Sequence, residues 1–273
     1  MPQVNEYHRP QTLQDALRLL DRRDRVTVPL AGGSWLVPRL RPEVAGPDAA
    51  VDAVVDLADL NLSYVAVAGE EGAAWLDLGA TTTLADLAAD GHCRELAGGL
   101  LAKAALREGP VNLRNAATVG GCIVRADAES ELVLALVVLH ARVTVDRGTR
   151  QDTVSVVDVL ADPAAAIGRG LITQVRIPWP AAGSRGGSDR VSRTPSDAPI
   201  VAVAALVAPE GIRIALGGVA PQPLLLHLSQ DDHLEPAVAA AVAAVDPPAD
   251  FRGSAEYRRA VAPVVARRAV ARA

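Results

Sequence analysis

The chain has 273 residues and is poor in cysteine, in aromatic residues and in lysine. Its two cysteines, Cys93 and Cys122, are too few for a disulfide framework or a cysteine-ligated zinc site. No apolar run approaches the roughly 18 residues that span a bilayer, and the N-terminus lacks the basic and apolar regions of a secretory signal. These absences predict a cytoplasmic protein that keeps its thiols reduced.

Aromatic residues make up only 3% of the chain although half of it is hydrophobic, so we expect a core of alanine, valine and leucine. The net charge of -5 argues against nucleic acid as the main partner. Positive charge is nonetheless concentrated in residues 251–273, which contain six arginines and one glutamate. This segment is expected to be a helix whose arginines either pair with the helix dipole and solvent or face an acidic partner.

Motifs of the common nucleotide-binding and hydrolytic sites are also missing. The chain contains no G-x-G-x-x-G after a strand, no G-x-x-x-x-G-K-[ST] and no G-x-S-x-G. Its five histidines are scattered, and none has the spacing of a metal ligand, so we expect no metal site in this chain. What remains is a protein without catalytic side chains, in which a bound cofactor does the electron chemistry and the protein supplies binding and orientation.

The most informative motifs are two pairs of adjacent glycines, Gly32-Gly33 in P-L-A-G-G-S-W and Gly120-Gly121 in N-A-A-T-V-G-G-C. Glycine takes positive φ at little cost and lets a ligand approach the backbone. Successive N–H groups on such a turn form an anion-binding concavity, and each pair has a hydroxyl nearby, Ser34 or Thr118. The two loops predict a site for a long, doubly anionic ligand such as a dinucleotide pyrophosphate. Either loop alone is equally consistent with an ordinary tight turn.

Capping patterns and hydrophobic periodicity predict a mixed order of helices and strands. Thr12 with Asp15, and Thr83 with Asp86, form capping boxes, and Ser130 caps a strongly apolar helix. The expected helices cover residues 13–23, two turns after 83, 95–107, 131–140, 232–245 and 254–271, and the expected strands 26–30, 54–57, 74–79, 141–145, 171–177, 200–207 and 212–216. Residues 181–199 are rich in glycine, serine, proline and arginine and predict a linker. The order indicates two α+β units rather than one doubly wound sheet.

Several short motifs, in one order, carry a family resemblance over nearly the whole chain. The most specific is R-N-A-A-T-V-G-G at 114–121, followed by Ala126-Asp127 and Ser130-Glu131-Leu132. The others are Y-H-R-P-Q-T-L at 7–13, A-G-G-S at 31–34, L-G-A-T-T at 78–82, L-G-G-V-A-P at 216–221 and D-F-R-G-S-A-E-Y-R at 250–258. Together they resemble the FAD-binding medium subunit of the molybdenum hydroxylases, the group of carbon monoxide dehydrogenase and xanthine dehydrogenase.

The resemblance implies an α+β fold. Its first part is a PCMH-type FAD-binding domain of two subdomains, and its second is a small C-terminal domain with a three-stranded antiparallel sheet and helices. We expect the FAD-binding domain at residues 1–170, with subdomains of about 1–56 and 57–170, and the C-terminal domain at 171–273.

By motif position, the resemblance assigns the FAD diphosphate and ribityl chain to the two glycine loops. It also places polar residues that contact the cofactor at Asp127, Ser130 and Glu131, for which helix capping is the alternative role. The implied cofactor-binding residues are Ala31, Gly32, Gly33, Ser34, Trp35, Thr118, Gly120, Gly121, Cys122, Asp127, Ser130, Glu131 and Arg190.

Three positions depart from the family pattern. Cys122 stands where the family usually has asparagine after the second glycine pair, and a thiol is a poorer hydrogen-bond partner than an amide. Glu131 is one methylene longer than the usual aspartate. A Tyr-x-Lys pattern that often lies near the isoalloxazine aligns with Ser188 and Arg190, so the aromatic ring is lost and the positive charge is kept.

The resemblance implies an FAD-carrying electron-transfer subunit of a multi-subunit molybdenum hydroxylase. A large molybdopterin subunit oxidises the substrate, a small [2Fe-2S] subunit relays single electrons, and the FAD of this chain passes them to a soluble acceptor, in a dimer of heterotrimers. Two cysteines cannot ligate a four-cysteine cluster, so the metals belong to the partners. The alternatives are a stand-alone FAD-dependent oxidase or reductase, and a structural subunit with weakened FAD binding.

Overall fold

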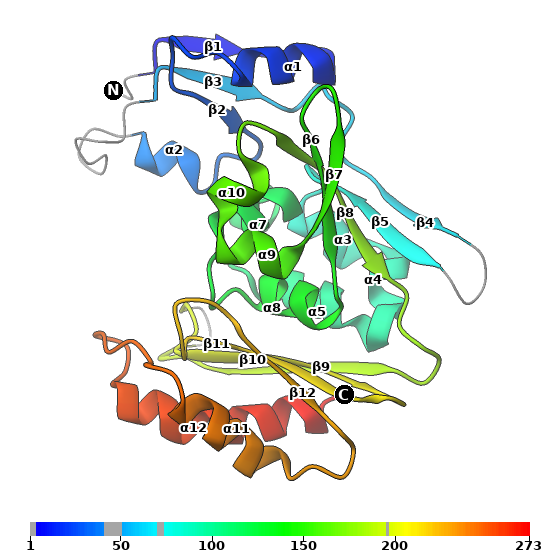
Figure 1. The fold of residues 1–273 in the computed structure, drawn as a ribbon, viewed down its shortest axis with the longest axis vertical. Coiled ribbons are helices and arrows are strands. Elements are labelled where there is room, and N and C mark those ends of the chain that lie inside the picture. The colour runs from blue at the N-terminus through cyan, green and yellow to red at the C-terminus, as the bar shows by residue number, and fades with distance from the viewer. Residues whose placement is uncertain (1–3, 41–50, 70–73, 195–196) are drawn as a thin grey trace.

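Three β-sheets follow one another down the long axis of the molecule, with the N-terminal sheet at the top of Figure 1. The structure is a computed structural model that describes residues 4–40, 51–69, 74–194 and 197–273. No helix within these ranges is both long and apolar enough to cross a membrane.

The N-terminal sheet has three parallel strands in the order β1-β3-β2: β1 (Glu6–His8), β2 (Thr27–Leu30) and β3 (Ala53–Asp56). Helix α1 (Leu13–Leu20) begins at the expected cap, because the Thr12 hydroxyl accepts a hydrogen bond from the Asp15 N–H at 3.1 Å. The chain leaves β2 through the first glycine pair and enters the short helix α2 (Leu36–Arg39). The end of β2 therefore positions the first glycine loop.

The middle sheet is antiparallel, in the order β4-β5-β8-β6-β7. Its strands are β4 (Val65–Ala68), β5 (Trp75–Gly79), β6 (Arg142–Asp146), β7 (Gln151–Ser155) and β8 (Leu171–Pro178). The domain boundary expected at residues 170/171 would assign β8, the central strand of this sheet, to the C-terminal domain. The step to the next sheet comes between β8 and β9 (Arg185–Val191).

Several helices lie in the chain between β5 and β8. They are α3 (Leu84–Ala89), α4 (Gly91–Glu95), the 3₁₀ turn η1 (Leu96–Gly99), α5 (Leu100–Arg107), α6 (Val111–Arg114), α7 (Val119–Arg125), α8 (Glu131–Val138), α9 (Val156–Ala161) and α10 (Pro163–Ile167). Of these, α7 contacts β5 and β8, and α9 contacts β7. The prediction of a single helix over residues 95–107 was wrong. Ala97, Gly98 and Gly99 have φ of 49°, 66° and 81°, so α5 starts only at Leu100. Left-handed residues cannot continue a right-handed helix.

Helix α8 is buried along its whole length. It packs on α5 on one side and on β10 (Val201–Ala208) and β11 (Gly211–Gly217) of the C-terminal sheet on the other. This position explains its uniformly apolar sequence after Glu131, because a helix covered on every side needs no polar face.

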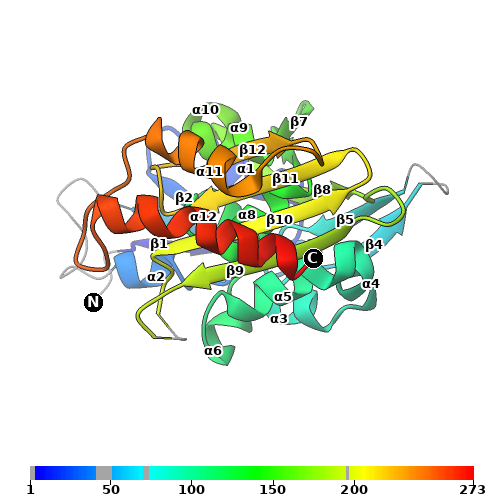
Figure 2. The same cartoon turned by 90° about the horizontal axis from the view of Figure 1, so that it is seen from below.

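The C-terminal sheet is antiparallel and has four strands, β12-β11-β10-β9, where three were expected. Strand β12 is Leu224–Leu228, and helices α11 (Leu234–Ala243) and α12 (Ala255–Ala271) lie across the outer face (Figure 2). Two of these strands were not expected from the sequence: β12, and β9, which falls in the segment expected to be a linker. Its small residues are packing requirements, since a Cβ on Gly187 would lie 2.1 Å from the carbonyl oxygen of Ala269 in α12.

Candidate functional site

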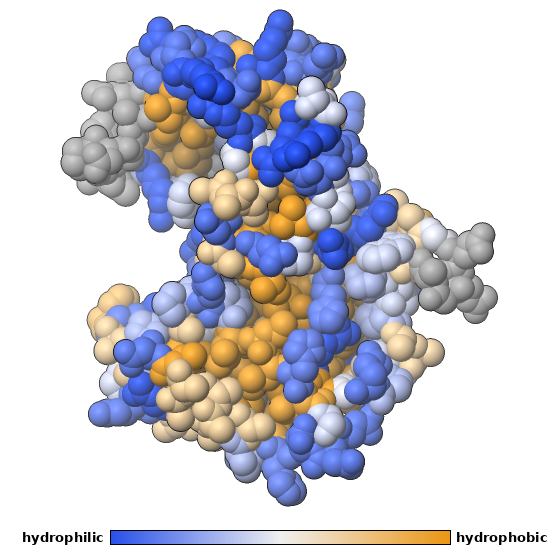
Figure 3. Space-filling view, in the orientation of Figure 1, coloured by the Kyte–Doolittle hydropathy of each residue, from blue (hydrophilic) through white to orange (hydrophobic). Residues whose placement is uncertain are grey.

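A cleft of about 580 Å³ separates the N-terminal unit from the middle unit. One wall is the end of β2, the first glycine loop and α2, and the other is built from α7, the end of α5 and the segment from α10 to β8. In space-filling view the molecule is hollowed on the side where α2 and α10 lie (Figure 3). The volume is in the range of about 300–1,000 Å³ that is typical of ligand and cofactor sites.

The first glycine loop, residues 31–35, lines this cleft as a whole. Gly33 has φ +67°, which favours glycine. Gly32 lies against the other wall, so closely that a Cβ there would be 1.5 Å from the carbonyl oxygen of Ala116. Within the described ranges, the N–H groups of Gly32, Gly33, Ser34 and Trp35 donate to no acceptor. The loop therefore presents four free donors to the cleft.

The second glycine pair also lines the cleft, but its structure differs from the expected open loop. Gly120 and Gly121 belong to the first turn of α7, and the Thr118 hydroxyl caps this turn by accepting from the Gly121 N–H at 3.2 Å. The Gly120 N–H donates to the carbonyl oxygen of Ala80 at 2.9 Å, and the Cys122 N–H to that of Thr118 at 3.0 Å. This pair thus offers the cleft a surface without side chains rather than free N–H groups.

Cys122 follows in α7 and lines the cleft beside the glycines. Its thiol is largely enclosed, and this burial, together with the nearby Glu108 carboxylate, raises its pKa to about 12. A neutral thiol is a weak donor and a weak nucleophile. Cys122 therefore presents a small, neutral group to whatever occupies the cleft.

We expect both thiols to be unreactive in the folded chain at pH 7.5. The pKa of Cys93 is also raised to about 12, by burial first, and alkylation requires the thiolate. Mass spectrometry after a brief maleimide pulse is expected to find neither cysteine labelled in native protein and both labelled in urea. Rapid native labelling of Cys122, with Cys122→Ser as the control, would contradict the enclosed thiol.

The remaining residues expected at the site lie behind the cleft wall. Asp127 pairs with Arg125 at 2.7 Å, and Ser130 caps α8 by accepting from the Val133 N–H at 3.2 Å. The buried Glu131 pairs with two arginines of other elements, Arg107 of α5 at 3.0 Å and Arg190 of β9 at 3.1 Å. None of Asp127, Ser130, Glu131 and Arg190 is among the residues that line the cleft. Glu131, Arg107 and Arg190 form a charge network that joins the middle unit to the C-terminal sheet, whereas Asp127 and Ser130 bond within the middle unit.

Ser188 belongs to the same network, since the Arg107 guanidinium donates to its hydroxyl at 3.2 Å. It is buried in β9. Arg107 reaches this hydroxyl from α5.

Glu108 is a cleft residue that sequence reasoning missed. Its carboxyl oxygen Oε1 accepts from the Ser130 hydroxyl at 2.7 Å and from the Leu132 N–H at 2.8 Å. Glu108 lies between the end of a helix and Gly109-Pro110 and belongs to no recognisable motif. The one sequence signal for it is that an acidic residue stands shortly before the R-N-A-A-T-V-G-G motif at 114–121.

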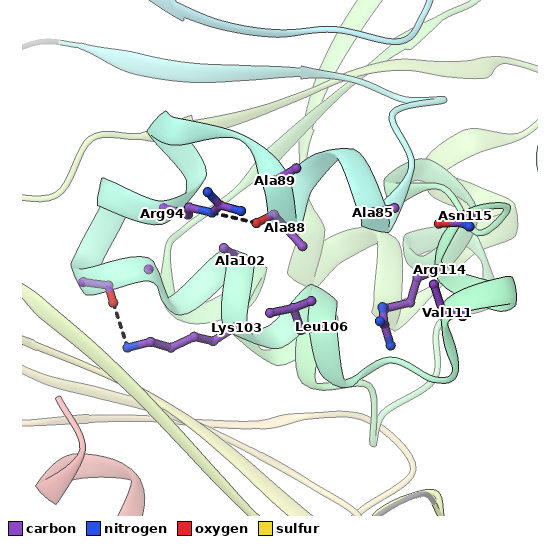
Figure 4. Close-up of a pocket in the computed structure, with 12 residues that line it drawn as sticks. Ala85, Ala88, Ala89, Arg94, Ala102, Lys103, Leu106, Val111, Arg114 and Asn115 are labelled. Atoms are coloured by element: carbon purple, nitrogen blue, oxygen red, sulfur yellow. Dashed lines mark hydrogen bonds between the residues drawn. The ribbon is translucent and has the colours of Figure 1, made fainter.

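Another hollow, of about 440 Å³, lies among α3, α4, α5 and α6 (Figure 4). Alanines of α3 and α5 line it, and Lys103, the single lysine of the chain, donates to the carbonyl oxygen of Gly98 at 2.9 Å at its edge. No residue expected at the cofactor site lines this hollow. The glycine-loop cleft is therefore the candidate cofactor site.

The fold and the cleft define a class of protein: a dinucleotide-cofactor subunit whose site is made by backbone donors and glycine surfaces rather than by catalytic side chains. Residues 3–180 match the family model of the FAD binding domain in molybdopterin dehydrogenase. Residues 189–273 match that of the CO dehydrogenase flavoprotein C-terminal domain. The chain belongs to this family of FAD-binding oxidoreductase subunits.

Its relatives are medium chains of dehydrogenases. The carbon monoxide dehydrogenase medium chain of Afipia carboxidovorans is 31% identical, over 100% of this chain and 98% of its own length. The glyceraldehyde dehydrogenase medium chain of Sulfolobus acidocaldarius is 29% identical, over 98% of each. In the structure of reconstituted CO dehydrogenase from Oligotropha carboxidovorans, the matching chain has a TM-score of 0.83 at 27% identity, over 100% of this chain and 98% of that one. These findings confirm the family, the α+β class and the FAD cofactor expected from the sequence.

Proposed function

We propose that this chain is the FAD-carrying electron-transfer subunit of a multi-subunit molybdenum hydroxylase. A molybdopterin-containing large subunit oxidises the substrate, and a [2Fe-2S] small subunit delivers the electrons to this chain, which passes them to a soluble acceptor. We further propose a cytoplasmic dimer of heterotrimers. The observation that carries the proposal is the cleft with four free N–H groups on the first glycine loop, in a chain that matches dehydrogenase medium chains over its whole length.

The donor set of the cleft fits a dinucleotide. Four N–H groups at residues 32–35 suit a diphosphate, because successive backbone amides form an anion-binding concavity. The glycine surface at 120–121 lets a flat or extended group approach α7, and Leu30, Leu57 and Leu171 supply apolar walls. We assign the cofactor contacts to Ala31, Gly32, Gly33, Ser34, Trp35, Thr118, Gly120, Gly121 and Cys122. Asp127, Ser130, Glu131 and Arg190, which do not line the cleft, are assigned to its support.

FAD, when bound, supplies the exchange between one-electron and two-electron transfer. The residues of this chain bind and orient it and exclude water from the cleft. Cys93 is buried and Cys122 lies in the cleft wall, so neither is placed to bind a cluster together with other cysteines. The metal-bound steps therefore belong to the partner subunits.

The test is co-expression of the full chain with the products of neighbouring genes, followed by purification and analysis of bound cofactors. We expect one FAD per chain from the visible spectrum, with iron and molybdenum co-purifying in the complex and FAD remaining on this chain when the subunits are separated. A yellow chain that oxidises a substrate without partners would support the stand-alone enzyme instead. A colourless chain inside an intact, metal-containing complex would support the structural subunit.

A further inference from the structure

Glu108 joins the cofactor cleft to the buried charge network. It is the C-cap residue of α5 and lines the cleft. Its Oε1 is held by the hydroxyl of Ser130 and the N–H of Leu132, which belong to the start of the buried helix α8. Its Oε2 has no hydrogen-bond partner in the part of the chain that the structure describes. One oxygen is therefore fixed, and the other remains available to a ligand.

Three carboxyl groups gather at this end of the cleft, and they differ in their partners. Asp127 pairs with Arg125 at 2.7 Å, and Glu131 has Arg107 and Arg190 at 3.0 and 3.1 Å. Glu108 makes no ion pair within the described ranges.

The surroundings of Glu108 favour its protonated form. Burial raises the pKa of Glu108 above its ordinary value of 4.5 and outweighs the hydrogen bonds from the Leu132 N–H and the Ser130 hydroxyl, which lower it. The negative charges of Asp127 and Glu131 raise it further. The other titratable group beside it, the Cys122 thiol, is neutral. Of these three carboxyl groups, Glu108 is the one without an arginine partner within the described ranges, and its pKa is raised.

We propose that Glu108 is a cofactor-binding residue that, as the neutral acid, donates a hydrogen bond from Oε2 to an acceptor on the flavin. This rests on the proposed function, since it presupposes FAD in the cleft. Capping of α8 is a structural role for the same side chain. That role uses Oε1 alone and is performed best by an ionised carboxylate, which the helix N-terminus itself stabilises. It gives no role to Oε2, which has no hydrogen-bond partner within the described ranges.

The two roles differ in how FAD binding responds to pH. If bound FAD holds the proton on Glu108, affinity is highest while the carboxyl is neutral and falls as the pH rises through its raised pKa, at a pH above 4.5. Glutamine keeps a donor at the same place but does not titrate. A purely structural role predicts no such titration of FAD affinity.

The experiment measures the FAD dissociation constant of the full-length chain, by flavin fluorescence, from pH 5 to 9. We expect the wild-type constant to rise about three- to tenfold across one titration step, the worth of one neutral hydrogen bond. Glu108→Gln is expected to remove this step, and Glu108→Ala to bind about three- to tenfold more weakly at low pH. The matched control is Asp127→Asn, which removes the neighbouring paired carboxylate. It is expected to keep the titration step but to move it to lower pH, because the negative charge of Asp127 raises the pKa of Glu108.

Each outcome separates this inference from the proposed function. If Glu108→Gln titrates as the wild type does, the inference is wrong while FAD binding stands. If the wild type binds no FAD at any pH, the proposed function itself is wrong. Should the variants not fold, infrared difference spectra of the wild type before and after FAD loading decide the matter. A shifted band of a neutral carboxyl is expected, and its absence would overturn the proposal.

Discussion

Gly32→Ala is expected to abolish retention of FAD and to lower the stability of the chain. The new Cβ would lie 1.5 Å from the carbonyl oxygen of Ala116, which is backbone and cannot swing away. The first glycine loop must then withdraw from the opposite wall, carrying its four donors with it. We expect a loss of about 3 kcal/mol, the upper range of overpacking, and a rise of about 100-fold or more in the FAD dissociation constant.

The control for this substitution is Gly91→Ala at the start of α4. A Cβ on Gly91 meets nothing within 4 Å, and alanine favours a helix over glycine. We expect unchanged flavin content and equal or slightly higher thermal stability. Flavin absorbance per chain and urea unfolding of both variants provide the comparison. Wild-type flavin content in Gly32→Ala would show that the two walls do not meet at this residue.

Arg258→Ala is expected to destabilise the C-terminal unit by about 3–5 kcal/mol, the cost of removing one partner from a buried charged network. Arg258 is fully buried in α12. Its guanidinium donates to the carbonyl oxygens of Ile200 and Gly218 and to the Asp250 carboxylate, which it meets at 2.9 Å. Removing it leaves two backbone acceptors and a carboxylate without that partner, at the point where β10, β11 and α12 converge.

Arg268→Ala, on the same helix, is the matched control. Arg268 is exposed and has no ion pair or hydrogen bond within the described ranges. We expect a change within about 0.5 kcal/mol, as for an ordinary surface position. Urea unfolding at saturating FAD measures both variants, so that a difference in cofactor loading does not enter. Equal stability of the two variants would mean that Arg258 does not hold the C-terminal unit together.

The helices and strands with strong local signals were predicted from the sequence. The caps at Thr12, Thr83 and Ser130 make the expected hydrogen bonds, because a capping box is a contact between residues three apart. Strand β9 was missed, since its glycines, serine and charges are typical of a loop. Its strand structure comes from pairing with β10 and from the close approach of α12, which local sequence does not specify.

The cofactor site divides in the same way. Both glycine pairs were identified, but the sequence predicted open anion-binding turns at both, and only the first has free N–H groups. In the second pair, the N–H groups already donate to the carbonyl oxygen of Ala80 and to the Thr118 hydroxyl. Glu108 was missed because its importance arises from contacts with Ser130 and Leu132, more than 20 positions away in the chain.

The sequence by itself determined the family, the cofactor and the residues of the two glycine motifs, since these depend on residue identity and order along the chain. The tertiary structure decided what each group is paired with. The arginines of residues 251–273 were expected either to pair with the helix dipole and solvent or to face an acidic partner, yet Arg258, Arg259, Arg267 and Arg272 pair with carboxylates elsewhere in this chain. The tertiary structure also decided that, of the carboxyl groups of Glu108, Asp127 and Glu131, only that of Glu108 has no ion pair with an arginine within the described ranges. The reason is physical: charge and hydrogen-bond energies depend on distances in space and on burial, and neither is set by spacing in the sequence.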